Sequence, residues 1–180
     1  QDQVAAAHGG LNVIRFRDGG IEVSPLQASK ERLQALEGNL LLLYTGTNRL
    51  GGEIAKQVIA NLGDKASSLR QLRGMVDTAV SIVAGNGDLD NFGRLLHEAW
   101  MLKRGIAADI SNETVDGIYE TALSHGAIGG KLCGAGSKGF MLFYVPKDRQ
   151  AQVMKSLSHY LWVPVAFDHE GSTTIYHDIP

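Results

Sequence analysis

The chain has little cysteine, little proline and few aromatic residues, and it lacks a long apolar run. Cys133 is the one cysteine among 180 residues, which excludes an intrachain disulfide and a zinc site built from cysteines. No apolar stretch approaches the roughly 18 residues of a membrane-spanning helix, and the start shows no signal-peptide pattern. We therefore expect no membrane partner and, since one thiol suits a reducing compartment, a cytoplasmic protein.

The chain also lacks a large excess of charge of either sign. The sequence has 17 basic and 19 acidic side chains and a formal charge of −2, which gives no electrostatic basis for binding nucleic acid or an anionic membrane. Apolar residues make up 44% and charged residues 20% of the chain, proportions typical of a globular protein rather than a disordered one. The length suits a domain with a real core.

Hydrophobic periodicity predicts an α+β fold, with helices packed on a mainly antiparallel sheet. The tail of a helix over residues 2–8 precedes a β-hairpin, whose strands cover 11–17 and 21–26. Residues 39–44 form an apolar run typical of a strand buried on both faces. Four helices are then predicted over residues 54–62, 69–83, 90–104 and 112–123. The closing elements are a strand over 140–145, a helix over 146–160, and strands over 163–167 and 173–176.

Two of these helices begin at residues that can cap them. Asp88 or Asp90 can cap the helix that ends near Lys103, whose positive charge complements the helix dipole. Ser111 or Asn112 can cap the next helix. Side-chain oxygens at these positions can accept hydrogen bonds from the backbone N–H groups of the first helical turn, which have no partner within the helix.

Glycine is abundant where other residues are scarce. The chain has 22 glycines in 180 residues, against roughly 7% in an average protein, and residues 126–139 read GAIGGKLCGAGSKG. Within them, Gly134, Gly136 and Gly139 form a G-x-G-x-x-G pattern. A dinucleotide site needs a strand before this pattern and a helix after it, and the sequence predicts the reverse order. The phosphate-binding P-loop pattern also fails, because Leu132 follows the lysine.

The glycine segment has a physical interpretation that needs no named motif. Closely spaced glycines let backbone N–H groups converge on an anion, since no Cβ blocks its approach. Lys131 and Lys138 add positive charge on either side. A tight turn that binds nothing is the alternative.

Other candidate residues carry weaker signals when taken alone. Asp2, near a helix end, is by default a cap or a solvated charge. Residues 45–49 join a buried strand to a helix, and they either face a ligand or cap that helix. The six histidines show no metal-ligand spacing, because His97-Glu98 is not followed by the second histidine of HExxH.

Several segments, taken together and in order, resemble one family. They are QDQVAAAHGG at the start, the strand and loop LLLYTGTNR, the block from FGRLLHEAWMLKRGI through GGKLCGAGSKGFMLFYV, and the closing FDHEGSTTIY. They resemble the GHMP kinases, named for galactose, homoserine, mevalonate and phosphomevalonate. Within that superfamily they are most similar to sugar kinases of the D-glycero-D-manno-heptose 7-phosphate type.

The resemblance implies an ATP- and Mg²⁺-dependent phosphoryl transfer to a sugar hydroxyl, at the anomeric C1 position in the heptose branch. Asp2 matches the aspartate that receives the hydroxyl proton. A glycine-rich turn beside the phosphates and substrate is matched by Gly134, Ala135, Gly136, Ser137, Lys138 and Gly139, where Ser137-Lys138 departs from the family pattern. Sugar contacts are expected at His8, Gly9, Gly10, Thr47 and Arg49.

Family members are about twice as long and place their ATP-binding loop before the matched aspartate. The resemblance therefore implies that residues 1–28 end an N-terminal kinase domain and that 29–180 form a ferredoxin-like GHMP kinase C-terminal domain. It also implies that ATP and Mg²⁺ bind mainly outside this chain, that no metal ligand lies within it, and that the 180 residues alone are inactive.

Two other functions fit the same sequence. A non-catalytic α+β module could bind a phosphosugar or regulate a partner without turning the sugar over. A domain for assembly could instead form a homodimer through a helix face with Trp100 and Met101, because aromatic residues are enriched at interfaces.

Overall fold

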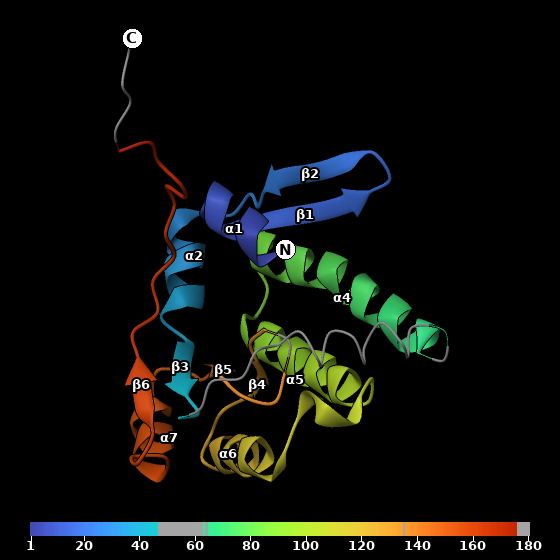
Figure 1. The fold of residues 1–180 in the computed structure, drawn as a ribbon. Coiled ribbons are helices and arrows are strands. Elements are labelled where there is room, and N and C mark those ends of the chain that lie inside the picture. Colours follow the sequence, from blue (N-terminus) through green and yellow to red (C-terminus); the bar gives the residue numbers. More distant parts are fainter. Residues whose placement is uncertain (47–62, 64, 135, 176–180) are drawn as a thin grey trace.

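The computed structural model describes residues 1–46, 63, 65–134 and 136–175. A two-stranded hairpin and a four-stranded antiparallel sheet carry the helices (Figure 1). The helices are α1 (Asp2–His8), α2 (Lys30–Glu37), α4 (Ala66–Ala84), α5 (Asp90–Arg104), the short 3₁₀ helix η1 (Ala108–Ile110), α6 (Glu113–Ser124) and α7 (Gln150–Ser156). The strands are β1 (Asn12–Arg17), β2 (Gly20–Pro25), β3 (Leu40–Tyr44), β4 (Gly129–Leu132), β5 (Phe140–Tyr144) and β6 (Leu161–Val163).

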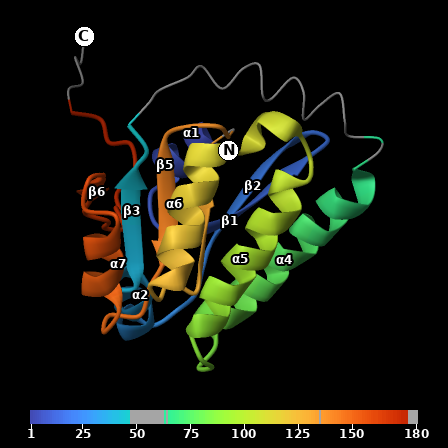
Figure 2. The same ribbon diagram turned by 90° about the horizontal axis from the view of Figure 1, so that it is seen from below.

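The larger sheet has the strand order β4-β5-β3-β6. β3 pairs antiparallel with β5 on one side and β6 on the other, so an early strand is central among strands from the end of the chain. α6 and α7 lie on one side of this sheet, and α1 and the hairpin lie on the other (Figures 1 and 2). The predicted α+β class with a mainly antiparallel sheet is confirmed.

The two faces of the sheet are covered to different extents. Alternate strand residues point to opposite faces, and the face with Leu43 and Phe143 packs fully against helix residues such as Trp100 and Tyr119. The opposite face is covered around Leu40 by a second cluster from α2, α4 and α5. Toward the other end of that face the cover stops.

The pairing of β4 with β5 shows which side chains lie at this end of the sheet face. Lys131 is paired with Leu142 and therefore shares its face. Cys133, two residues further along, lies on the same side, opposite Phe140, whose carbonyl oxygen accepts a hydrogen bond from the Cys133 amide. Phe140 is 38% exposed. Among the described residues, this end of the sheet is thus partly exposed.

Helix α5 runs closely along the edge strand β4. A Cβ on Gly129 would collide with the carbonyl oxygen of Gly93, and a Cβ on Gly93 would lie 2.7 Å from the Tyr144 ring. Two glycines therefore allow this helix and strand to touch backbone to backbone. As a consequence, the C-terminal end of α5 lies beside the residues that follow β4.

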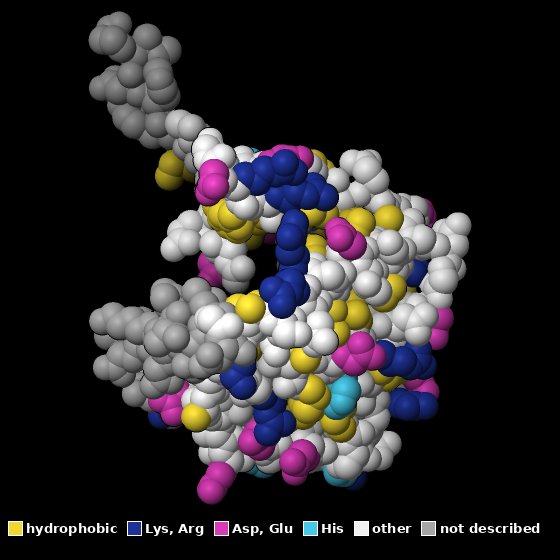
Figure 3. All heavy atoms as spheres, turned by 90° about the vertical axis from the view of Figure 1, so that its right-hand side faces the viewer, with side chains coloured by type: hydrophobic (Ala, Val, Ile, Leu, Met, Phe, Trp, Pro, Cys, Tyr) yellow, Lys and Arg dark blue, Asp and Glu magenta, His cyan; other side chains and the backbone are white. Residues whose placement is uncertain are grey.

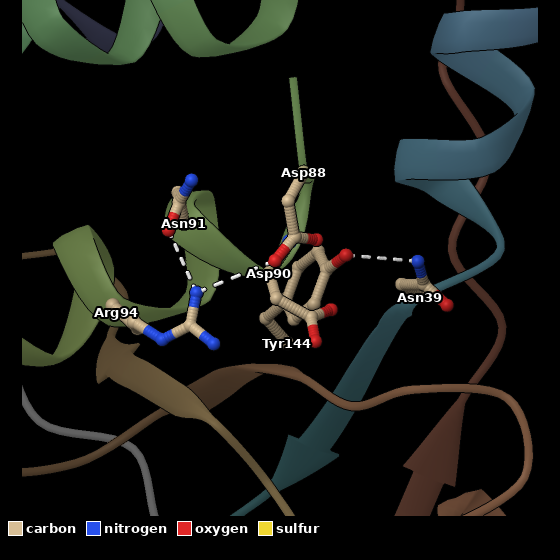
Figure 4. A network of polar contacts seen from close by, with 6 residues as sticks. All are labelled: Asn39, Asp88, Asp90, Asn91, Arg94 and Tyr144. Atoms are coloured by element: carbon tan, nitrogen blue, oxygen red, sulfur yellow. Dashed lines mark hydrogen bonds and ion pairs between the residues drawn. The ribbon is translucent and has the colours of Figure 1, made fainter.

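Polar residues gather where the other end of α5 lies beside the sheet (Figure 4). The Asn39 amide donates to the Tyr144 hydroxyl at 2.9 Å, and Arg94 lies 3.5 Å from the Asp88 carboxylate. Burial, with the negative charge of Asp90, raises the pKa of Tyr144 to about 12. The phenol therefore stays neutral at physiological pH, as its position between two core elements requires.

Several predicted elements differ from the structure. The strand β6 ends at Val163, where residues 163–167 were expected to be extended, because Pro164 has no N–H for a ladder. Residues 173–175 are not in a strand, and α7 covers Gln150–Ser156 rather than 146–160. The helix expected over 54–62 lies outside the described residues. Helix α2 and strand β4 were not predicted.

The helix face expected to form an assembly surface is partly in the core. Trp100 is fully buried in the main cluster, so the prediction that it faces another subunit is wrong. Met101, its neighbour, is 37% exposed. None of the described helices is both long enough and apolar enough to span a bilayer.

Candidate active site

The centre of the site is the glycine loop, residues 133–139, which connects β4 to β5. Its backbone is left-handed at Gly134, Gly136 and Gly139, with φ of 74°, 134° and 119°. A Cβ on Gly136 would lie 2.9 Å from the Cα of Ile110, so at that position both conformation and space require glycine. The glycines thus build a defined turn, and Ala135 lies outside the described residues.

Three neighbouring elements hold this loop in place. At the end of β3, the Thr45 amide donates to the Gly139 carbonyl at 2.9 Å, and the Gly139 amide donates to the Thr45 hydroxyl at 3.0 Å. The Asn112 side chain donates to the Ser137 carbonyl and also accepts from the Val115 amide at 3.0 Å, which caps α6. One asparagine therefore both starts a helix and anchors the loop.

One side of the loop borders a cavity of about 520 Å³ at the N-terminus of α6. Ser137 is only 7% exposed and has a φ of 68°, which is rare for a residue other than glycine. Its hydroxyl lines this cavity and forms no hydrogen bond with any other described residue. Lys138 is exposed and lines the same cavity, as does the carboxylate of Glu113.

The other side of the loop carries two lysines. Lys103, at the end of α5, donates from Nζ to the Gly134 carbonyl at 2.7 Å. Burial lowers the pKa of Lys103, and the positive charge of Lys131 lowers it further, whereas Cys133 and Asp2 act in the opposite sense. Burial raises the pKa of the Cys133 thiol, and both lysines oppose that effect.

Asp2 lies at the start of α1, where its side chain is exposed. The N-terminus and the C-terminal end of α5 are at the same end of the molecule (Figure 2). The negative charge of Asp2 is the weakest of the named influences on the pKa of Lys103, and it opposes the lowering by burial.

The expected sugar-contact residues gather at a second place. His8, Gly9 and Gly10 line a cavity of about 350 Å³ together with His169. The Gly10 amide donates to the Asp168 carbonyl, and a Cβ on Gly9 would collide with the Gly171 backbone. Two segments that belong to the resemblance, one from each end of the chain, therefore pack together. Thr47 and Arg49 lie outside the described residues.

A third cavity lies between the hairpin and α4. It measures about 780 Å³ and is lined by Arg15, Arg17 and Arg73 among others. Lys and Arg side chains gather above a hollow on the face that Figure 3 shows. Glu22 lies 3.1 Å from Arg17 and 3.8 Å from Arg15, so part of this charge is already compensated.

Lys103 has a contact that its sequence position does not predict. The sequence places it at a helix end beside Arg104, where both complement the dipole. In the fold Arg104 pairs with Asp116 at 2.8 Å, whereas Lys103 reaches the glycine loop. No sequence signal separates the two cations, because their roles depend on which side of α5 faces β4.

The described residues contain no cluster of three or more histidine, cysteine, aspartate or glutamate side chains able to hold a metal ion.

Comparison with known proteins finds similar sequences and structures among kinases. Residues 78–161 match the family model of the GHMP kinases C-terminal domain. D-glycero-alpha-D-manno-heptose 7-phosphate kinase of Campylobacter jejuni is 30% identical over 160 residues, which are 87% of this chain and 47% of that protein. The structure of L. major mevalonate kinase in complex with R-mevalonate superposes with a TM-score of 0.70 at 22% identity, over 96% of this chain and 53% of that one. A D-glycero-D-manno-heptose 1-phosphate kinase from Bacteroides thetaiotaomicron gives 0.61 at 24%, over 97% and 48%.

The chain therefore resembles the GHMP kinases C-terminal domain in sequence over residues 78–161. Over nearly its whole length it has the fold of one half of L. major mevalonate kinase. It spans about half the length of the relatives it matches.

Proposed function

We propose that this chain is part of an ATP-dependent sugar kinase that phosphorylates a sugar or sugar-phosphate hydroxyl, with C1 of heptose 7-phosphate as the first candidate. The observation that carries the proposal is the glycine loop, held by Lys103, in a chain that matches the GHMP kinases C-terminal domain over residues 78–161. The heptose assignment is supported by the 30% identical kinase from Campylobacter jejuni.

In the proposed reaction, Asp2 accepts the proton of the sugar hydroxyl as its oxygen attacks the γ-phosphorus of ATP. The new oxygen–phosphorus bond forms while the bond from the γ-phosphorus to the bridging oxygen breaks, and ADP leaves. Such transfers depend mainly on positioning and on stabilising charge. The exposed carboxylate at the start of α1 suits the first requirement, and the amides and lysines around the glycine loop suit the second.

ATP and Mg²⁺ are proposed to bind mainly through parts of the kinase outside this chain, because the relatives are about twice as long. We also propose that residues 1–28 belong with that other domain. The hairpin β1–β2 forms a sheet of its own, separate from the four-stranded sheet, which supports this boundary. A cytoplasmic location suits both ATP and a free thiol.

The test is ADP release by the kinase that contains this chain, measured on a panel of sugars and sugar phosphates. We expect turnover with heptose 7-phosphate to exceed that with galactose, fucose and mevalonate. Turnover only with another sugar would overturn the substrate assignment. Saturable binding of phosphosugars without any ADP release would favour the non-catalytic binding module.

A further inference from the structure

Lys103 and Lys131, the lysine pair, are half-buried cations that form no ion pair with another described residue. Neither lies within 4.0 Å of a carboxylate in the described part of the chain, although four other ion pairs are formed there. Two like charges held together away from bulk water repel each other, and burial removes the hydration that would compensate. The arrangement is therefore favourable only when an anion lies between them.

A hydrogen bond holds Lys103 at the glycine loop, and Lys131 lies on the strand that leads into that loop. Lys103 uses one of its three ammonium hydrogens on the Gly134 carbonyl at 2.7 Å, which leaves two for a ligand. Lys131 lies on β4, and its side chain is on the same face of the sheet as Leu142. It is three residues before Gly134 in the sequence. The glycine contact between α5 and β4 keeps the two elements in fixed register.

We propose that the lysine pair binds the non-bridging oxygens of the phosphoryl group that is transferred. This inference rests on the proposed function. A sugar-phosphate kinase binds two phosphates, the one that is transferred and the one already on the sugar. The chain begins at the same end of the molecule as the C-terminal end of α5 (Figure 2). The proton acceptor proposed at Asp2 therefore assigns the lysine pair to the transferred phosphoryl group, which is bound next to the attacked hydroxyl.

A binding test uses Cys133, the one thiol of the chain, as a reporter. The chain is alkylated with iodoacetamide with and without inorganic phosphate, at constant ionic strength kept with chloride. We expect phosphate to slow alkylation several-fold in the wild type, but not in K103M, K131M or the double variant. K155M, which removes an exposed lysine on α7, is the matched control and should behave as the wild type.

The rate ratio with and without phosphate is compared within each variant, because the lysines themselves lower the pKa of the thiol. K131M leaves the Lys103–Gly134 hydrogen bond in place, so it separates loss of binding from loss of loop structure. K103R keeps the charge and should restore part of the protection. Equal protection in the double variant, or none in the wild type at saturating phosphate, would overturn the proposal.

Kinetics of the kinase that contains this chain give the second readout. Removing one lysine should lower kcat by about 10²–10³-fold and leave the KM of the sugar within a few-fold. A rise in KM confined to phosphorylated sugars would instead assign the lysine pair to the substrate's own phosphate. Phosphate protection without turnover of any sugar would refute the proposed function and leave the anion site standing.

Discussion

At the scale of single residues, position in the fold separates side chains of the same type. Lys103 and Arg104 are adjacent cations, and only Lys103 reaches the glycine loop, because Arg104 is held by Asp116. The chemistry of this domain therefore depends on a few positions rather than on composition.

Asp2→Asn tests the proton acceptor. The amide keeps the size of the side chain but accepts no proton at neutral pH, so we expect kcat of the kinase to fall by about 10²–10⁴-fold. Asp18→Asn, in the exposed turn of the hairpin, is the matched control and should leave kcat unchanged. Near-normal turnover of the Asp2 variant would remove this residue from the mechanism.

Gly136→Ala tests the backbone of the glycine loop. Its φ of 134° and the 2.9 Å approach to Ile110 should make the variant less stable to urea by about 1–3 kcal/mol. Gly74→Ala, on the exposed side of α4, meets no atom within 4 Å and should stabilise the chain by about 0.5–1 kcal/mol. Equal effects of the two substitutions would show that the turn geometry is not required.

At the scale of elements, the sequence predicted those with strong periodicity and missed those that depend on partners. The hairpin, β3, α4, α5 and α6 follow from alternation, an apolar run and helical spacing. β4 reads GGKL, which has low strand propensity, and it is extended because β5 pairs with it along its whole length. α2 is short, and its only local signal is the Ser29 cap.

The same limit applies to the site. Family resemblance selected Asp2 and the glycine loop, and their roles stay predictions. The importance of Lys103 could not be predicted, because it arises from the passage of α5 along β4, a long-range contact that needs glycine on both elements. Local pattern carries no information about such a contact.

Asn112→Ala tests whether the start of α6 also organises the loop. Loss of the cap should destabilise the chain by about 1 kcal/mol, and loss of the bond to the Ser137 carbonyl should loosen the loop and speed alkylation of Cys133. Ser29→Ala removes the cap of α2 without touching the loop. It should therefore cost similar stability in urea and leave the alkylation rate unchanged. The same alkylation rate in both variants would restrict Asn112 to capping.

At the scale of the whole molecule, the chain spans about half the length of the relatives it matches. The proton acceptor proposed at Asp2 and the lysine pair are therefore a part of what the proposed reaction requires. Phosphoryl transfer also needs groups that bind the nucleotide and its metal ion. Binding of an anion and turnover of ATP are therefore separable properties of this protein.

That separation gives a prediction for the 180 residues by themselves. We expect no ADP release from ATP and heptose 7-phosphate above the rate without protein, while inorganic phosphate still protects Cys133 from alkylation. The phosphate site needs only α5, β4 and the glycine loop, all of which the chain contains. Turnover by the chain alone would show that its own residues bind ATP productively, and would overturn the assignment of nucleotide binding to the rest of the kinase.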